Sequence, residues 1–398
     1  MGASISKLVD PFLMKIGSTS KGINKGQLSQ GAIDLINKSY EGVKEIYDMH
    51  SHLVAEGHGC CAHPNLSAPL THPICTAKKV AFKSASGIEF DEKDTDQAYV
   101  DKLVKRTQDM GIKYKHFILA MDHWYDPDGT MREDRTGLYI SNDYMMSVVA
   151  AYPEHFMPCI SVNPYRADAL AELDKYGQMG VKMVKWLPNS MGMDPSHPKC
   201  VPFYQKMAQY NMVLLCHVGE EHSVSAGGMK QSLGNPLLLR LALDNGVKVI
   251  AAHCASEGTN IDLDDPEQKK VDNFDLFIRL MDTPKYKGLL FADISSLITF
   301  KRCGKPLITI LNRTDLHDRL VFGTDYPVPA IGLIVHTKAL AQAGYITWEE
   351  KPLLDEIFEF NPLLFDFVLK RTAKSPDFGN KFSLDIFGWN ANLLGTKS

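Results

Sequence analysis

The chain alternates short apolar runs with longer segments in which apolar residues recur every three or four positions. Short apolar runs bounded by turn residues are typical of buried strands, and the longer spacing is typical of amphipathic helices. The runs that we expect to be strands lie at 44–50, 115–121, 156–162, 181–187, 212–218, 247–253, 287–294 and 319–325. The helical segments lie at 95–110, 142–152, 165–179, 199–210, 235–245, 268–282, 304–315 and 330–343.

Repeated strand–helix alternation favours parallel strands joined by crossover helices. Eight such units in 398 residues predict an α/β fold, a closed (β/α)8 TIM barrel. A doubly wound open sheet is the alternative, but the glycine fingerprint that it often carries after its first strand is absent. We expect an N-terminal extension (1–40), a metal-dependent barrel domain (41–370) and a C-terminal tail packed on the barrel (371–398).

Two regions interrupt the regular alternation. Residues 347–370 predict added helices divided at Asn361-Pro362, because proline cannot continue a helix interior. A long insertion follows the first strand at 55–79 and contains a Cys/His-rich stretch at 58–75. Its spacing matches no zinc-finger motif, so we interpret it as a lid over the barrel opening, with a structural metal site as the alternative.

Histidine and aspartate residues stand at the ends of four predicted strands. His50 and His52 end the first strand, His217 the fifth, His253 the sixth and Asp325 the eighth. The carboxyl ends of barrel strands meet at one rim, which carries the active site in enzymes of this fold. Small or aliphatic residues occupy every second position behind His217, His253 and Asp325, so each is expected to cap an inward-facing column.

His50 and His52 share one strand face, so both rings can bind the same ion. Together with His217 and Asp325 they offer three imidazoles and one carboxylate. Such a nitrogen–oxygen set suits zinc, with manganese or iron as alternatives. We therefore predict a divalent metal site with one position open to water, which is typical of catalysis.

The same residues carry a resemblance to a known family. The matching pieces are Asp48-Met-His50-Ser-His52, GVKMVKW with Lys185, LLCHVG with His217, VIAAHC with His253, and VFGTDYP with Asp325. Over residues 44–370 the sequence resembles the amidohydrolase superfamily, in its amidohydrolase-related branch of metal-dependent barrel hydrolases and decarboxylases.

The resemblance implies that His50, His52, His217 and Asp325 hold the metal. It also implies that Asp325 transfers protons and that His253 polarises the substrate carbonyl or stabilises an oxyanion. A histidine that only supports the ligands is the alternative for His253. Lys185 would bridge two ions or bind an acidic substrate, and one ion is favoured over two.

Aromatic and charged residues near the same strand ends are candidates for substrate contacts. We expect Lys185 and Trp186 after the fourth strand, Trp124 after the second and Glu220 after the fifth to line the pocket. Solvent-exposed loop polarity is the alternative for Glu220.

Composition limits the partners. The formal net charge of -4 offers no basic face for nucleic acid, so we expect a small-molecule substrate, and a homo-oligomer remains open. The eight cysteines lack a disulfide framework spacing, which favours a reducing, cytoplasmic setting. The start MGASIS fits an acylation signal at Gly2, and a single acyl chain would give weak, peripheral membrane association.

Three functions stay open. The leading hypothesis is a metal-dependent hydrolase that cleaves a C–N or C–O bond of an amide, lactam or lactone. The alternative enzyme is a non-oxidative decarboxylase of a small aromatic or unsaturated carboxylic acid that uses the same metal site. The third is a catalytically silent, membrane-tethered scaffold, which only Gly2 and the segment after it suggest.

Overall fold

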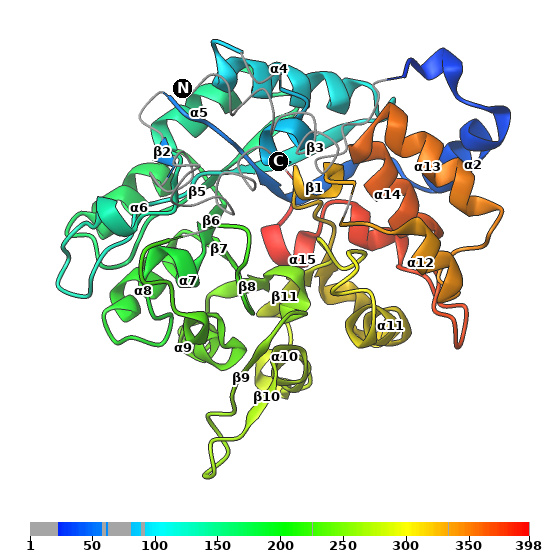
Figure 1. Ribbon diagram of the computed structural model, residues 1–398. Helices are drawn as coiled ribbons and strands as arrows, with labels where there is room; N and C mark the ends of the chain where they lie inside the picture. Colours follow the sequence, from blue (N-terminus) through cyan, green and yellow to red (C-terminus); the bar gives the residue numbers. More distant parts are fainter. Residues whose placement is uncertain are drawn as a thin grey trace, which may run out of the picture.

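The computed structural model describes residues 23–57, 61–62, 81–88, 92–224, 226–332 and 334–397. Within this part of the chain, eight parallel strands form one sheet in chain order, with helices around it (Figure 1). The strands are β1 (Ile46–His52), β3 (Tyr114–Leu119), β5 (Phe156–Ile160), β6 (Met183–Trp186), β7 (Val213–Cys216), β8 (Lys248–Ala251), β11 (Leu290–Asp293) and β12 (Leu320–Val321). Each lies at a predicted run, which confirms the predicted barrel.

The barrel closes where the segment after β12 returns to β1. The His52 amide donates to the Tyr326 carbonyl oxygen at 2.9 Å, and Ser51 forms a parallel bridge with Tyr326. A Cβ atom on Gly323 would lie only 2.9 Å from the Cβ of His50. Because glycine lacks that atom, the two segments can approach closely enough to close the ring.

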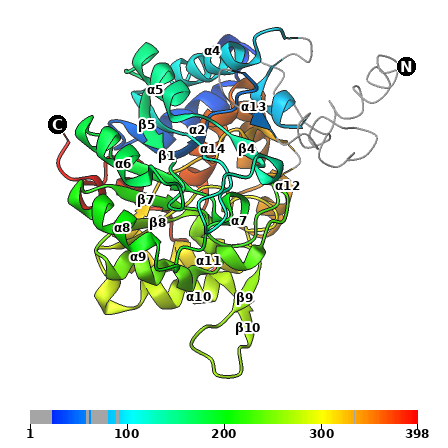
Figure 2. The same cartoon turned by 90° about the vertical axis from the view of Figure 1, so that its left-hand side faces the viewer.

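Helices follow most strands. They are α4 (Thr95–Gln108), α5 (Asn142–Ala151), α6 (Ala169–Gln178), α7 (Pro188–Met191), α8 (Cys200–Gln209), α9 (Arg240–Asp244), α10 (Asn273–Met281), α11 (Lys305–Asn312) and α12 (Thr337–Gln342). Side-chain caps define several starts; the Asp94 carboxylate accepts from the Gln97 amide at the start of α4. The helix predicted from residue 268 begins only at Asn273, because β10 (Lys270–Asp272) pairs with β9 (Thr259–Ile261) as a hairpin that projects from the barrel (Figures 1 and 2).

Added helices cover one side of the barrel. Residues Glu350–Phe360 form α13 and Pro362–Thr372 form α14, and the Asn361 side chain caps α14 by accepting from the Leu363 amide. Within the predicted N-terminal extension, α2 (Gln30–Tyr40) packs on these helices, with the rings of Tyr40 and Phe367 stacked 5.4 Å apart. The extension and the added helices therefore share one interface.

The sheet separates two apolar regions. Outward-facing strand residues pack against the helices, and inward-facing ones fill the barrel together with the C-terminal tail. Leu393 and Leu394 of α15 (Ala391–Leu394) join the inner cluster, and the Trp389 ring meets Tyr47 edge-on at 5.1 Å. Figure 1 shows this red segment over the middle of the ring. The tail thus closes the N-terminal end of the barrel.

Part of the predicted chemistry falls on residues that the structure does not describe. Gly2 and most of the 55–79 insertion lie outside the described ranges. Of the cysteines and histidines in 58–75, only Cys61 is described. Cys61–Ala62 forms β2, which pairs with β4 (Leu138–Tyr139). Among the described helices, none is long and apolar enough to span a membrane.

Candidate active site

A cavity of about 270 Å³ opens at the carboxyl ends of the strands. Its floor contains the residues that sequence predicted for the metal and for catalysis: His50, His52, Lys185, His217, His253 and Asp325. Its upper wall is largely apolar, with Phe82, Leu138, Val224, Phe300 and Ile334. A mostly apolar pocket with a few converging polar groups is typical of a small-molecule site.

An irregular β1 directs both of its histidines into the cavity. The pairing register of β1 with β3 shifts between Asp48 and Ser51. The buried Asp48 carboxylate fills this irregularity, because its Oδ1 accepts from the His50 amide at 3.1 Å and from the Thr324 amide at 2.9 Å. The rings of His50 and His52 consequently lie with centroids 5.2 Å apart.

His253 enters the cavity by a different route from the one that strand alternation predicts. β8 ends at Ala251, and both Val249 and Ala251 pack outward against the helices, so the inward column predicted behind His253 is wrong. The backbone then turns left-handed, with φ of 57° at His253. This turn stacks the His253 ring on that of His50, with centroids 4.9 Å apart.

Left-handed backbone clusters around this cavity. Seven described non-glycine residues have a positive φ. Five of them belong to the segments that follow β8, β11 and β12: His253 (57°), Cys254 (51°), Ala255 (50°), Ser296 (55°) and Asp325 (63°). Each such conformation costs about 1–3 kcal/mol and persists only where the surroundings enforce it. Strain of this kind concentrates at functional sites, so its position supports the cavity as the candidate site.

Asp325 lies among the histidines. Its Oδ1 is 3.1 Å from His52 Nε2 and 3.5 Å from His50 Nε2, and its Oδ2 accepts from Ser296 Oγ at 2.7 Å. Burial raises the pKa of Asp325, but the nearby rings of His253 and His52 hold it well below its usual range. The carboxyl group is therefore an anion facing imidazole nitrogens.

His50, His253 and Asp325 each offer one ligand atom, and these three atoms lie within 4.8 Å of one another. The group is buried and could hold a divalent metal ion. We expected the metal ligands to be His50, His52, His217 and Asp325. The compact donor group in the described chain instead contains His253 beside His50 and Asp325.

His217 lies at the edge of this group. Its ring meets that of His253 at 5.2 Å, while its Nε2 lies 3.5 Å from Glu221 Oε2. Burial lowers the pKa of His217 to about 4, against the opposing charge of Glu221. A neutral imidazole is the form that binds metals.

Lys185 lies at the floor of the cavity. Its Nζ is 3.0 Å from His50 Nε2, and burial lowers its pKa. We expected Lys185 to bridge two ions or to bind an acidic substrate; within the described chain its hydrogen-bond partner is this imidazole nitrogen. The Lys185 amine therefore contacts the same His50 nitrogen that faces Asp325.

Two tryptophans expected in the pocket lie elsewhere. Trp186 follows Lys185 on β6 and so faces the opposite way; its Nε1 donates to the Val162 carbonyl oxygen at 2.8 Å in the layer between strands and helices. The buried Trp124 ring packs over Gly192, where a Cβ atom would lie 2.2 Å from it. Neither lines the cavity.

Glu220 also points away from the cavity. Its Oε2 lies 3.2 Å from His222 Nε2, and its Oε1 accepts from the Thr259 amide at 3.4 Å. The next residue, Glu221, lines the cavity instead. A loop with an irregular backbone gives no alternation from which to choose between the two.

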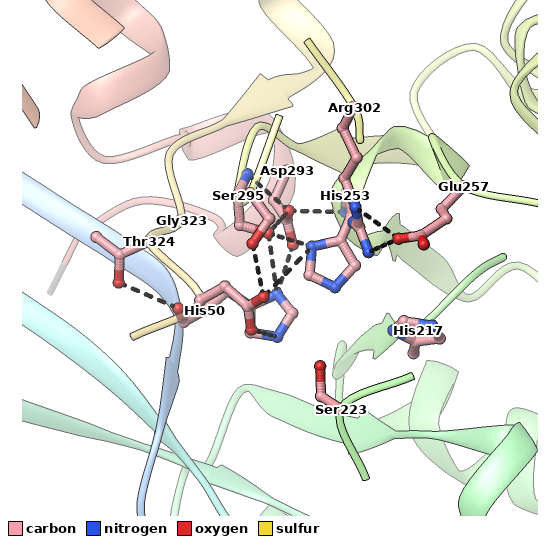
Figure 3. Close-up of polar contacts among 12 residues, drawn as sticks. His50, His217, Ser223, His253, Glu257, Asp293, Ser295, Arg302, Gly323 and Thr324 are labelled. Carbon is pink, nitrogen blue, oxygen red and sulfur yellow. Dashed lines mark hydrogen bonds and ion pairs between the residues drawn. The ribbon is translucent and has the colours of Figure 1, made fainter. Parts of the chain in front are cut away.

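Sequence reasoning missed two buried groups of the site. Asp293 ends β11 and contacts the His50 ring and the His253 backbone amide, on the side of the two rings that faces away from His217 (Figure 3). Arg302 lines the cavity, and its guanidinium donates to Glu257 Oε2 through Nε at 3.2 Å and Nη2 at 3.1 Å. Its buried Nη1 has no hydrogen-bond partner in the described chain. Asp293 could have been found, because it ends a predicted strand as the other site residues do.

No protein-family model and no curated protein matches the sequence. Similar solved structures include the TIM-barrel protein Bb4693 from Bordetella bronchiseptica, with 17% identity over 75% of this chain and 99% of that one and a TM-score of 0.45. The 5-carboxyvanillate decarboxylase LigW2 from Novosphingobium aromaticivorans, solved with bound manganese, has 11% identity over 81% and 95% with a TM-score of 0.45. Amidohydrolase 2 from Bifidobacterium longum subsp. infantis has 12% identity over 80% and 94% with a TM-score of 0.40.

These proteins are of the kinds that the sequence motifs resemble. With TM-scores of 0.45 or less, however, the likeness carries no argument about the reaction of this chain.

Proposed function

We propose that this protein is a metal-dependent hydrolase of a small molecule, acting on a C–N or C–O bond of an amide, lactam or lactone. The observation that carries the proposal is the convergence of His50, His253 and Asp325 within 4.8 Å at a strained, buried rim of the cavity. His50, His52, His217 and Asp325 would hold one divalent cation, with His253 within reach. Zinc suits this nitrogen-rich set best, and manganese or iron remain alternatives.

When bound, such a cation supplies Lewis acidity and lowers the pKa of a water molecule to about 7. The residues of the chain direct the rest of the reaction. The water oxygen forms a bond to the carbonyl carbon, and the C–N or C–O bond breaks. Asp325, whose Oδ2 is held by Ser296 Oγ, would accept the water proton on Oδ1 and pass it to the leaving nitrogen or oxygen.

The decarboxylase is the second candidate, because basic side chains line the cavity, among them Arg302 and Lys185. The buried Nη1 of Arg302 has no hydrogen-bond partner among the residues that the structure describes, and Lys185 lies on the floor. An arginine fork is the preferred partner of a carboxylate, which a decarboxylation substrate must carry. In that reaction the C–C bond to the carboxyl group breaks, carbon dioxide leaves and a proton replaces it.

Elemental analysis of the purified protein, followed by turnover of amides, lactones and unsaturated carboxylic acids, tests the proposal. We expect about one zinc per chain, metal-dependent hydrolysis and no release of carbon dioxide. Carbon dioxide release from the acids would favour the decarboxylase instead. If no substrate of the panel is turned over, either with or without divalent metal, the hydrolase and the decarboxylase are both contradicted and the scaffold is favoured.

A further inference from the structure

A single buried carboxylate connects the two stacked histidines of the site. Asp293 Oδ2 lies 2.9 Å from His50 Nδ1. Its Oδ1 accepts from the backbone amides of His253 at 2.9 Å and Ser295 at 3.0 Å, and from Ser295 Oγ. Figure 3 shows Asp293 and Ser295 on the side of the two rings that faces away from His217. Asp293 and Ser295 are fully buried, so solvent does not compete for these bonds.

The contact with Asp293 fixes the tautomer of His50. An ionised carboxylate only accepts hydrogen bonds, so the proton of the neutral ring must lie on Nδ1. Nε2 then carries the lone pair, and the Lys185 Nζ at 3.0 Å donates to it. The nitrogen of His50 that faces Asp325 is consequently the one able to bind a metal.

Ser295 fixes the tautomer of His253 by the same reasoning. Its hydroxyl proton is donated to Asp293 Oδ1, so its oxygen is an acceptor for the His253 Nδ1 at 2.7 Å. The ring proton of neutral His253 therefore also lies on Nδ1. The His253 Nε2 is then an acceptor, able to bind a metal or take a proton.

We propose that Asp293 and Ser295 are positioning residues that hold His50 and His253 in the Nδ1–H tautomer, so that each Nε2 carries a lone pair. The inference rests on the proposed metal-dependent function. Asp293 prepares His50 as a ligand, and Ser295 sets the acceptor role of His253. This changes the role expected for His253 from the sequence, because an oxyanion is stabilised by a donor and not by a lone pair.

Asp293→Asn tests the first half of the proposal. Oδ1 accepts from two amides and a hydroxyl, so the amide oxygen must occupy its place. The new NH₂ group then faces His50 Nδ1, which forces the ring proton onto Nε2 and removes the lone pair. We expect ¹⁵N NMR of the full-length, metal-free protein to show this switch, and zinc affinity in chelator competition to fall by about 10–100-fold.

Ser295→Ala tests the second half, with Ser256→Ala as its matched control. Ser256 also carries a buried hydroxyl, but this hydroxyl has no hydrogen-bond partner in the described chain. Ser295→Ala should give His253 a mixture of tautomers and leave the His50 tautomer unchanged, because Asp293 Oδ2 still accepts from the His50 Nδ1. Ser256→Ala should leave both spectra unchanged.

A proton on Nε2 of either ring in the wild-type protein would overturn the inference, and so would an unchanged His50 tautomer in folded Asp293→Asn. If Asp293→Asn does not fold, an unchanged His253 tautomer in Ser295→Ala overturns it. Wild-type protein that binds no zinc contradicts the proposed function alone, because the ring spectra of the metal-free protein still decide the tautomers.

Discussion

At the N-terminal end of the barrel, Leu393, Leu394 and Trp389 of the tail fill the space between the strands with apolar atoms. At the carboxyl end, the backbone is left-handed at non-glycine residues, and imidazoles and carboxylates are buried side by side. Packing of the first kind stabilises a fold, whereas burial of polar groups in strained backbone costs free energy. The apolar N-terminal end therefore stabilises the barrel, and the polar carboxyl end holds the candidate site.

The largest expected effect is at the polar end. Asp325→Asn keeps the shape of the side chain but removes its charge, so proton transfer is lost. We expect turnover to fall by about 100- to 10,000-fold, with metal partly retained. Initial rates and elemental analysis of the same preparation measure both effects. The control Asp315→Asn changes an exposed carboxylate that pairs with Arg313, and it should leave the rate unchanged. Near-normal rates for Asp325→Asn would show that the proton-transfer role is misassigned.

The apolar end should respond in stability and not in chemistry. Leu393 is 1% exposed, so Leu393→Ala leaves a cavity beneath the strands. We expect a loss of about 2–5 kcal/mol in the free energy of unfolding, measured by urea titration, with zinc affinity unchanged. Leu384→Ala in the same tail is the control, because this side chain is 40% exposed. Equal losses for the two variants would contradict the closing role of the tail.

Metal should stabilise the strained end. Zinc that binds only the folded chain, at about 100 times its dissociation constant, adds about 2.7 kcal/mol to the free energy of unfolding. Burial lowers the pKa of His217 to about 4, so protons should compete for this imidazole, and the gain should decline, as the pH falls towards 4. Thermal unfolding with and without zinc at several pH values measures it. A gain that persists at low pH would mean that histidines are not the main ligands.

The smallest effect is expected on the projecting hairpin, away from both ends. Hydrogen bonds from Arg279 lower the pKa of Asp262 from 3.8 to about 2. Because the folded pKa is depressed, this stabilisation is present above pH 3.8 and is lost as the pH falls towards 2. The Arg279 side chain is 41% exposed, so solvent screens the pair and Arg279→Gln should cost only about 0.2–1 kcal/mol at neutral pH, and less in high salt. A larger cost in urea titration would mean that the hairpin contributes to the core.

Strand alternation located much of the site. It correctly pointed His217 and Lys185 inward, because β6 and β7 are regular up to these residues. It failed at His253, where the left-handed turn after β8 reverses the direction of the side chain. It was also misapplied to Trp186, since neighbours on a strand cannot face the same side.

Other parts of the site depend on contacts between distant segments. Asp293 and His50 are far apart in sequence, and so are Arg302 and Glu257. No local pattern reports such pairs, because periodicity describes one element at a time. The position of Asp293 at a strand end could have marked it as a candidate. Its hydrogen-bond partners could not have been predicted from the sequence.

The sequence by itself determined the barrel and the rim to which its histidines belong. Hydrophobic periodicity sets which elements form and which faces they bury, and right-handed crossovers leave few ways to arrange them. The tertiary structure decided which atoms meet: the tautomer-setting carboxylate of Asp293, the inward turn of His253 and the outward face of Trp186. These depend on contacts of about 3 Å between segments that only the closed barrel brings together.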